Sequence, residues 1–595
     1  MIQIICLLLP PLLLMCFRKY LAGELKELKF SLKSVVEYLL TLLLFTFLIF
    51  LVLVIVFHHT GEFDNAFSQH STFVMYYLCM SVFFALALPL SEKLFRSRVN
   101  IKVAPSIHAN LSMDKFWNLC LWIYSGILTF LNFIRCFNNA LWGDEAFTAR
   151  MARIALPDMI SQTAMDVHPP LYYIFTHVSF QIAGDSGFAY RFVSFLAYLI
   201  IVILGLTVIK KGFGRIAAFL LITFSSLTNY ALTYNVEIRM YSWAALFVFV
   251  SYLSCYYILK NNSWKSWALF VVASLCAAYT HYYALIMVAV FYACFIVMSI
   301  RKTRFRIKTT VASIVTIIGY LPWFFVLLKT FSRTSSSWWL NSIPSLEDCI
   351  LAIFTYKWML PVFLAGFIIF VFYESGILKI GLPDLQEWKQ GGKANIIIGG
   401  SVSVTTDLIF VVMGILSALG TVAVGLGLSH AVRPFFMCRY LWPVAPVMYL
   451  VLGQIISKLK LRNIWCVIIM GAFLFCAAPY YCKVYEYGSS LNKATTEFQK
   501  NVMLDASDYI LTNSSHHAWT ILSYYYPKTA IKSVPNENFD IDTGDKNVWI
   551  FWTSELSEYT VKYYEDRQES CTLEYQGWLG NDTPLFVYKI ERGVD

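Results

Sequence analysis

Long apolar runs separated by short polar segments occupy most of this 595-residue chain. A helix that crosses a bilayer needs about 20 mostly apolar residues. Runs near that length predict a polytopic α-helical membrane protein with about 14 transmembrane helices. The expected spans lie near residues 2–17, 35–57, 73–90, 117–137, 186–209, 216–234, 240–259, 267–280, 283–300, 309–331, 358–373, 404–428, 440–456 and 464–481.

The loops between these runs differ in positive charge. One alternating set of loops holds 26 Lys and Arg, whereas the intervening set holds seven. Because basic loops stay in the cytoplasm, the N-terminus, the loop 138–185 and the last hundred or so residues are expected outside it. The short pair 267–280 and 283–300 could instead form one tilted helix, but the charge alternation holds on both sides of it. We therefore predict two helices there.

The chain becomes polar from about residue 483 onward, which predicts a small extracytoplasmic α/β domain. A helix is expected over 496–511 and strands over Asn547–Trp552 and Leu585–Ile590. The expected division is an N-terminal membrane segment of three helices (1–116), a membrane domain (117–482) with its first outer loop at 138–185, and this tail domain (483–595).

Composition supports a membrane protein and argues against two other classes. The chain is 58% hydrophobic and 14% charged, whereas soluble domains carry about 25% charged residues. The net charge of +10 does not indicate nucleic-acid binding, because the Lys and Arg lie in separate short loops rather than on one face. The 14 Cys mostly lie inside apolar runs and show no spacing typical of a disulfide framework or a zinc site.

The first long outer loop contains two polar motifs. Trp142-Gly143-Asp144-Glu145 follows the fourth apolar run, and Asp166-Val167-His168-Pro169-Pro170 comes later in the same loop. Asp144 alone could simply cap a short helix beginning at Ala146. The double proline, however, holds the backbone extended, so Asp166 and His168 are expected in fixed positions.

Other outer turns carry ionisable and aromatic groups that a plain connector does not need. They are Glu237-Ile238-Arg239-Met240-Tyr241, Thr280-His281-Tyr282-Tyr283, Arg433-Pro434 and Arg439-Tyr440. Each has a simpler interpretation: Arg239 could pair with Glu237, His281 could be a packing residue and Arg439 could anchor at the interface. Together they are typical of a site for an anionic group beside a proton-accepting carboxylate, because the arginine fork suits phosphate and a carboxylate can deprotonate a hydroxyl.

These motifs resemble membrane glycosyltransferases of the GT-C fold. The closest likeness is to the bacterial dolichyl-phosphate-mannose protein mannosyltransferase and aminoarabinose transferase type, and it covers about 117–481. The resemblance implies a multi-pass protein of the bacterial cell membrane with an extracytoplasmic active site. It also implies a polyprenyl-phosphate sugar donor and inverting transfer of the sugar to an acceptor hydroxyl. The acceptor could be a protein, a glycolipid or a wall polymer, and the sugar is open.

The resemblance also implies roles for individual residues. Asp144 would be the general base, and Glu145 its neighbour in acceptor binding or positioning. Asp166 would orient His168 or the acceptor. The remaining substrate-binding residues, several of them around the donor phosphate, would be His168, Arg239, Tyr241, His281, Arg439 and Tyr440. No cofactor is required, because the leaving group is already a phosphate ester, but Asp144, Asp166 and His281 are candidates for a divalent metal.

The sequence departs from the family pattern in two places. The three spans before residue 117 are an addition. His168 also stands where the aminoarabinose branch often has a Lys, which argues against aminoarabinose transfer to lipid A. The main alternative is a transporter for a lipid-linked glycan, although no duplicated halves are evident. A receptor or scaffold would leave both loop motifs unexplained.

Overall fold

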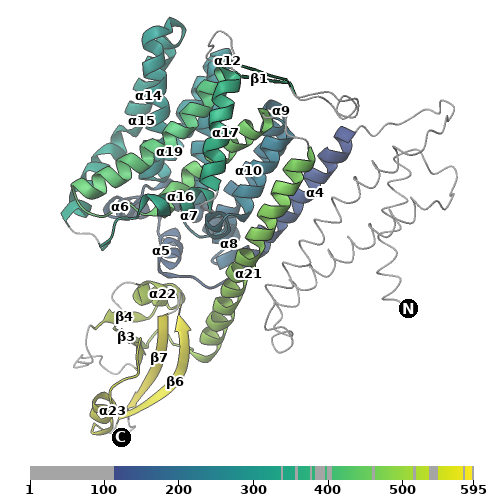
Figure 1. Cartoon of the computed structure of the whole chain (residues 1–595). Helices are drawn as coiled ribbons and strands as arrows, with labels where there is room; N and C mark the ends of the chain where they lie inside the picture. Colours follow the sequence, from purple (N-terminus) through teal and green to yellow (C-terminus); the bar gives the residue numbers. More distant parts are fainter. Residues whose placement is uncertain are drawn as a thin grey trace, which may run out of the picture.

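A computed structural model describes residues 113–336, 339–355, 359–375, 378–381, 395–398, 405–458, 463–513, 517–534, 547–567, 569–579 and 583–592. The expected spans at 2–17, 35–57 and 73–90 lie outside these residues. Over the described part the protein is a helical bundle with a small sheet domain at one end (Figure 1).

A helix is present at every span position expected from residue 117 onward. Seven helices of the described part are long and apolar enough to cross a membrane, or eight if the bent pair α16 and α17 counts as one span. The bundle helices are α4 (Met113–Phe133), α8 (Gly187–Leu204), α9 (Lys210–Phe213), α10 (Arg215–Leu227), α11 (Asn229–Tyr234), α12 (Tyr241–Asn261), α13 (Trp264–Thr280), α14 (Tyr282–Arg301), α15 (Thr303–Ser336), α16 (Leu346–Phe354), α17 (Met359–Glu374), α19 (Thr406–Ala431), α20 (Ala445–Lys458) and α21 (Asn463–Asn501).

Short elements complete the bundle and its loop end. They are η1 (Ile134–Phe137), α5 (Gly143–Ala152), α6 (Leu156–Met165), α7 (Leu171–Ala183), η2 (Gly205–Ile209), η3 (Cys438–Val444) and the hairpin of β1 (Leu378–Gly381) and β2 (Asn395–Ile398). The expected span 216–234 divides into α10 and α11, and α10 has only 13 residues. The expected count of 14 spans is therefore not reached among the described residues.

The doubtful pair at 267–300 forms two helices, as predicted. His281 separates them with an extended backbone (φ −156°, ψ 134°), and its ring nitrogen accepts the backbone N–H of Tyr283 at the start of α14. This break places the His281 side chain at the end of the bundle, where the two helices turn.

Those basic loops that the structure describes lie at the end of the bundle opposite the loop 138–185 (Figure 1). At one end, Asn262 donates to the carbonyl of Arg304 (2.7 Å), and Lys458 pairs with Asp407 (2.8 Å). At the other end, α5 lies next to the sheet domain (Figure 1). The structure thus separates the two sets of loops, and which end faces outward stays a prediction.

The tail forms the expected α/β domain. It comprises β3 (Tyr509–Thr512), α22 (His517–Tyr525), β4 (Ala530–Ser533), β5 (Val548–Trp552), α23 (Glu558–Glu565), β6 (Glu569–Leu579) and β7 (Thr583–Arg592). The five strands have the order β4-β3-β5-β7-β6, with parallel pairing among the first three and antiparallel pairing in the rest.

The helix expected over 496–511 was wrong in its C-terminal part. α21 runs continuously across residue 482 and ends at Asn501, and the chain then enters strand β3. A turn separates the two elements: the Asp508 carboxylate accepts the backbone N–H of Asp505 (2.8 Å). An Asp side chain that bonds nearby backbone offers the chain an alternative to continuing the helix.

The tail domain packs directly on the loop 138–185. Leu141 and Ala146 share one buried apolar cluster with Phe498 and Ile521. Arg153 donates to the carbonyl of Tyr524 at the end of α22 (2.9 Å). The two segments therefore form one continuous end of the molecule, and this end holds the motifs singled out in the sequence.

Candidate functional site

The first turn of α5 presents two adjacent carboxylates in different directions. The helix begins at Gly143, so Asp144 and Glu145 both lie in its first turn, where negative charge is favourable. Glu145, not Asp144, accepts the backbone N–H of Trp142 (3.4 Å). The helix that Asp144 could have capped was placed from Ala146 onward, whereas α5 begins three residues earlier, at Gly143.

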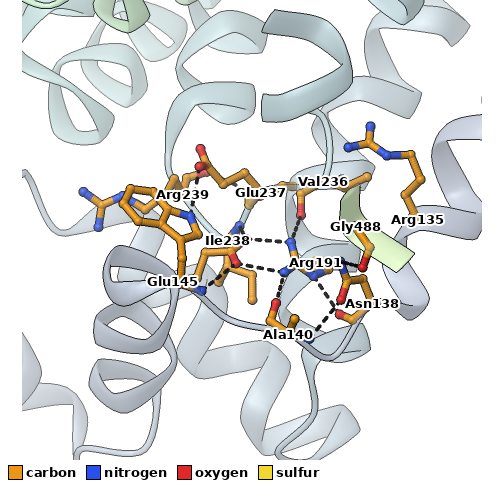
Figure 2. A network of polar contacts seen from close by, with 12 residues as sticks. Arg135, Asn138, Ala140, Glu145, Arg191, Val236, Glu237, Ile238, Arg239 and Gly488 are labelled. Carbon is orange, nitrogen blue, oxygen red and sulfur yellow. Dashed lines mark hydrogen bonds and ion pairs between the residues drawn. The ribbon is translucent and has the colours of Figure 1, made fainter. Parts of the chain in front are cut away.

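Glu145 is buried in an ion pair with Arg191 of α8 (Figure 2). Arg191 donates to the two Glu145 oxygens at 2.6 and 2.8 Å, and Ile238 N donates to one of them at 3.0 Å. Arg191 also donates to the carbonyls of Asn138 and Ala140. Glu145 is therefore arranged to position α5, and its oxygens are not available to an acceptor.

Asp144 faces the other direction and lies between two arginines. Its Oδ2 atom is 3.6 Å from Arg239 Nη2 and 3.8 Å from Arg439 Nη1. Arg239 comes from the turn between α11 and α12, and Arg439 comes from η3. The structure therefore brings together the three residues that the sequence motifs place in separate loops.

His168 adjoins this cluster from the double-proline segment. Its Nδ1 is 3.3 Å from Asp166 Oδ2, and its Nε2 is 3.5 Å from Arg239 Nη2. Burial and the neighbouring Arg239 lower the pKa of His168, so the ring is neutral at pH 7. An Arg cannot accept a hydrogen bond, so the proton belongs on Nδ1, which donates to Asp166.

Asp166 is the fixed partner of this ring. Burial opposes its ionisation, but the interactions with His168, the Val167 backbone and Arg239 together outweigh burial and lower the pKa of Asp166 to about 2. Tyr173 also donates to it (3.1 Å), and Arg333 donates to its backbone carbonyl (2.9 Å). Asp166 is thus placed to orient His168, which is one of the two roles expected for it.

Aromatic rings line the other side of the arginines. The Arg439 guanidinium lies 6.0 Å from the ring of Tyr241 and 5.9 Å from that of Tyr440, within cation–π range. The His281 ring lies 5.6 Å from Tyr241 and 5.2 Å from Tyr440. Burial, together with His168 and the arginines, lowers the pKa of His281 well below its usual value. His281 is therefore a neutral member of this aromatic group.

The three metal candidates do not come together as a ligand set. Asp144 pairs with arginines, Asp166 with His168, and one ring nitrogen of His281 caps α14. Among the described residues no group of three or more His, Cys, Asp or Glu is arranged to hold a metal ion.

Two functional neighbours were missed from the sequence. Arg191 lies inside an expected span, and an ionisable residue there is itself a signal. Glu237 was noted only as part of its motif, yet it accepts the indole N–H of Trp142 at 3.1 Å. Both residues belong to the polar network that fixes the start of α5 (Figure 2).

Part of the bundle that carries the site matches a known protein family. Residues 167–329 match the family model described as dolichyl-phosphate-mannose-protein mannosyltransferase. The chain resembles membrane glycosyltransferases of this family. The matching segment of this glycosyltransferase-like chain includes His168, Arg239, Tyr241 and His281, whereas Asp144 and Arg439 lie outside it. The resemblance stated from the motifs is thereby confirmed.

One solved structure is also similar to the chain, whereas no curated sequence is. The crystal structure of ArnT from Cupriavidus metallidurans in the apo state is similar with a TM-score of 0.49 and 11% sequence identity, covering 80% of this chain and 98% of that one. No curated protein sequence matches the chain.

Proposed function

We propose that this protein transfers a sugar from a polyprenyl-phosphate donor to an acceptor hydroxyl, with inversion at the anomeric carbon. The observation that carries the proposal is the position of the Asp144 carboxylate, within 4 Å of both Arg239 and Arg439. Two guanidiniums suit a phosphate, and a carboxylate beside them suits deprotonation of an attacking hydroxyl.

Phosphate binding by the two arginines and proton acceptance by Asp144 can follow one another in a single reaction. A donor phosphate binds Arg239 and Arg439 and replaces Asp144 as their anionic partner, which leaves that carboxylate for the acceptor hydroxyl. The acceptor oxygen then bonds to the anomeric carbon as the bond from that carbon to the phosphate oxygen breaks. The hydroxyl proton passes to Asp144, and the two arginines stabilise the charge that develops on the departing lipid phosphate.

Further residues have supporting roles in this proposal. His168 holds Arg239 from one side, with Asp166 fixing its tautomer. Tyr241 and Tyr440 lie beside the Arg439 guanidinium, and His281 packs against both rings, which reduces contact with water and so strengthens the charge interactions. Glu145 positions α5.

We also propose the placement of the site in the cell. The basic loops between described helices lie at the end opposite the site, and the positive-inside rule puts that end in the cytoplasm. The loop 138–185, which carries Asp144, and the domain from about 483 onward then face outward, as expected for a bacterial cell-membrane enzyme. There the acceptor could be a protein, a glycolipid or a wall polymer.

Turnover of the purified protein with a panel of labelled polyprenyl-phosphate sugars tests the proposal. Transfer to any acceptor supports it, and transfer that persists in EDTA shows that a divalent metal is not needed. If no sugar moves between molecules while the lipids cross between leaflets of a vesicle, the protein is a transporter and the proposal fails.

A further inference from the structure

Two segments of the chain run side by side at the site and are joined by several polar contacts (Figure 2). The first is 142–145, at the start of α5, and the second is 237–239, before α12. The Trp142 indole donates to Glu237 Oε1 (3.1 Å), and Arg239 pairs with the Asp144 carboxylate (3.6 Å). The contact between Ile238 and Glu145 lies between these two links. Glu237 is thus connected, through Trp142, to the segment that carries Asp144.

The second oxygen of the Glu237 carboxyl has no hydrogen-bond partner among the residues that the structure describes. Only 8% of Glu237 is exposed, so water cannot fully solvate a charge there. A buried ionised carboxylate without a full set of partners is costly, and such a group tends to hold its proton instead. Burial first, and then the Glu145 carboxylate, raise the pKa of Glu237 to about 8.

The groups around Glu237 include both signs of charge. Asp144 and Glu145 on α5 oppose its ionisation, while Arg439 on η3 and Arg239 in its own segment favour it. Tyr172 on α7, Arg191 on α8, Tyr234 on α11 and Tyr241 on α12 also interact with it electrostatically. The raised value shows that burial and the carboxylates prevail over the arginines.

We propose that Glu237 is a positioning residue that works in its neutral form, holding Trp142 with one oxygen and leaving Arg239 and Arg439 free for the donor phosphate. This inference rests on the proposed function, because it takes the two arginines to be the phosphate site. When Glu237 loses its proton, a second carboxylate competes with the phosphate for the arginines and repels it.

The direction of the pH dependence follows from this arrangement. Glu237 is neutral below about pH 8, so phosphate binding is strong there and weakens as the pH rises through that value. A bound phosphate places more negative charge beside Glu237 and so favours its neutral form. Binding near pH 8 is therefore accompanied by proton uptake, as linkage requires.

Binding of a polyprenyl monophosphate to the full-length protein in lipid nanodiscs tests the inference without needing turnover. For the wild type we expect the dissociation constant to rise about tenfold between about pH 7.5 and 9.5. Glu237→Gln keeps an acceptor for Trp142 but cannot ionise, so its pH dependence should disappear while its affinity at pH 7.5 stays close to that of the wild type. Glu555→Gln, at an exposed position of the tail domain, is the matched control and should follow the wild type.

If Glu237→Gln does not fold, a second measurement on the wild type alone still tests the inference. Calorimetric titration at pH 8 in two buffers of different ionisation enthalpy should reveal proton uptake on binding. Wild-type affinity that does not change with pH, or Glu237→Gln that keeps the wild-type slope, would overturn the inference. If either of these two results is obtained and the protein still transfers sugar, the inference fails and the proposed function stands. If binding depends on pH as expected but no sugar is transferred, the inference is supported and the proposed glycosyltransferase activity is not.

Discussion

Arg191 binds both oxygens of Glu145 at 2.6 and 2.8 Å, and the two side chains are only 7% and 3% exposed. This pair joins α8 to the first turn of α5, and Arg191 also holds the backbone that leads into that turn. The position of Asp144, one residue away, therefore depends on an ion pair that itself takes no part in the proposed chemistry.

Removing one member of this pair should destabilise the protein strongly. Arg191→Met leaves the Glu145 carboxylate buried without its partner, which typically costs about 3–5 kcal/mol. We expect a clear drop in the thermal unfolding midpoint in detergent. Replacing both residues with Met should recover part of that loss, because no uncompensated charge remains. A midpoint for Arg191→Met equal to that of the wild type would show that the pair is not important for stability.

Asp144→Asn should remove sugar transfer and leave the fold unchanged. The amide has nearly the same shape but cannot accept the hydroxyl proton, and a general base typically contributes about 10²–10⁴-fold to the rate. The measurement is single-turnover transfer together with the thermal midpoint. Asp158→Asn, at an exposed position of α6, is the control. Normal transfer by the Asp144 variant would exclude Asp144 as the base.

The sequence predicted where the site lies better than it predicted which way each side chain points. Helix periods and charge alternation located the helices from residue 117 onward, and ionisable groups at loop positions marked Asp144, Arg239 and Arg439. Neighbouring residues on a helix point about 100° apart, so the start of α5 decides which of Asp144 and Glu145 faces the arginines. That start depends on contacts with Arg191 and Ile238, which are distant in sequence.

The error in the tail has a similar cause. Residues 496–511 have a composition compatible with a helix, but the helix ends at Asn501 and the chain then turns at Asp505 and Asp508. The following residues gain more by pairing with β4 and β5 on both sides of β3. Strand pairing between distant segments is not visible in a local pattern.

Arg439→Lys should weaken donor binding more than it slows the chemical step. Lysine keeps the positive charge but loses the planar fork and the stacking on Tyr241 and Tyr440. We expect the KM for the donor to rise about tenfold, with a smaller change in kcat. Arg153→Lys, which changes an arginine at the contact with α22, should leave the donor KM as in the wild type. Equal KM values for the Arg439 variant and the wild type would remove Arg439 from the phosphate site.

Two buried histidines that are neutral in the folded protein should reduce its stability as the pH drops below about 6.5, while Glu237, with its pKa raised to about 8, contributes in the opposite direction over the same range. The pKa values of His168 and His281 are lowered from 6.5 by burial first and then by nearby positive groups. At these two positions the unfolded chain therefore binds more protons than the folded one as the pH falls, and protonation there favours unfolding. Asp166 does not contribute over this range, since its pKa lies near 2 in the folded protein and at 3.8 in the unfolded reference.

Thermal midpoints at about pH 7.5 and 5.5 give the net change, and comparing the wild type with variants of the two histidines isolates their share. His168→Asn can still donate to Asp166, and His281→Asn can still cap α14, because Asn is a good N-cap residue. Neither variant can be protonated at that position, so each should lose less of its midpoint on acidification than the wild type, and the double variant less again. If all four proteins lose the same amount, the two histidines are not the groups that take up protons on unfolding, and their neutral state in the site would have to be abandoned.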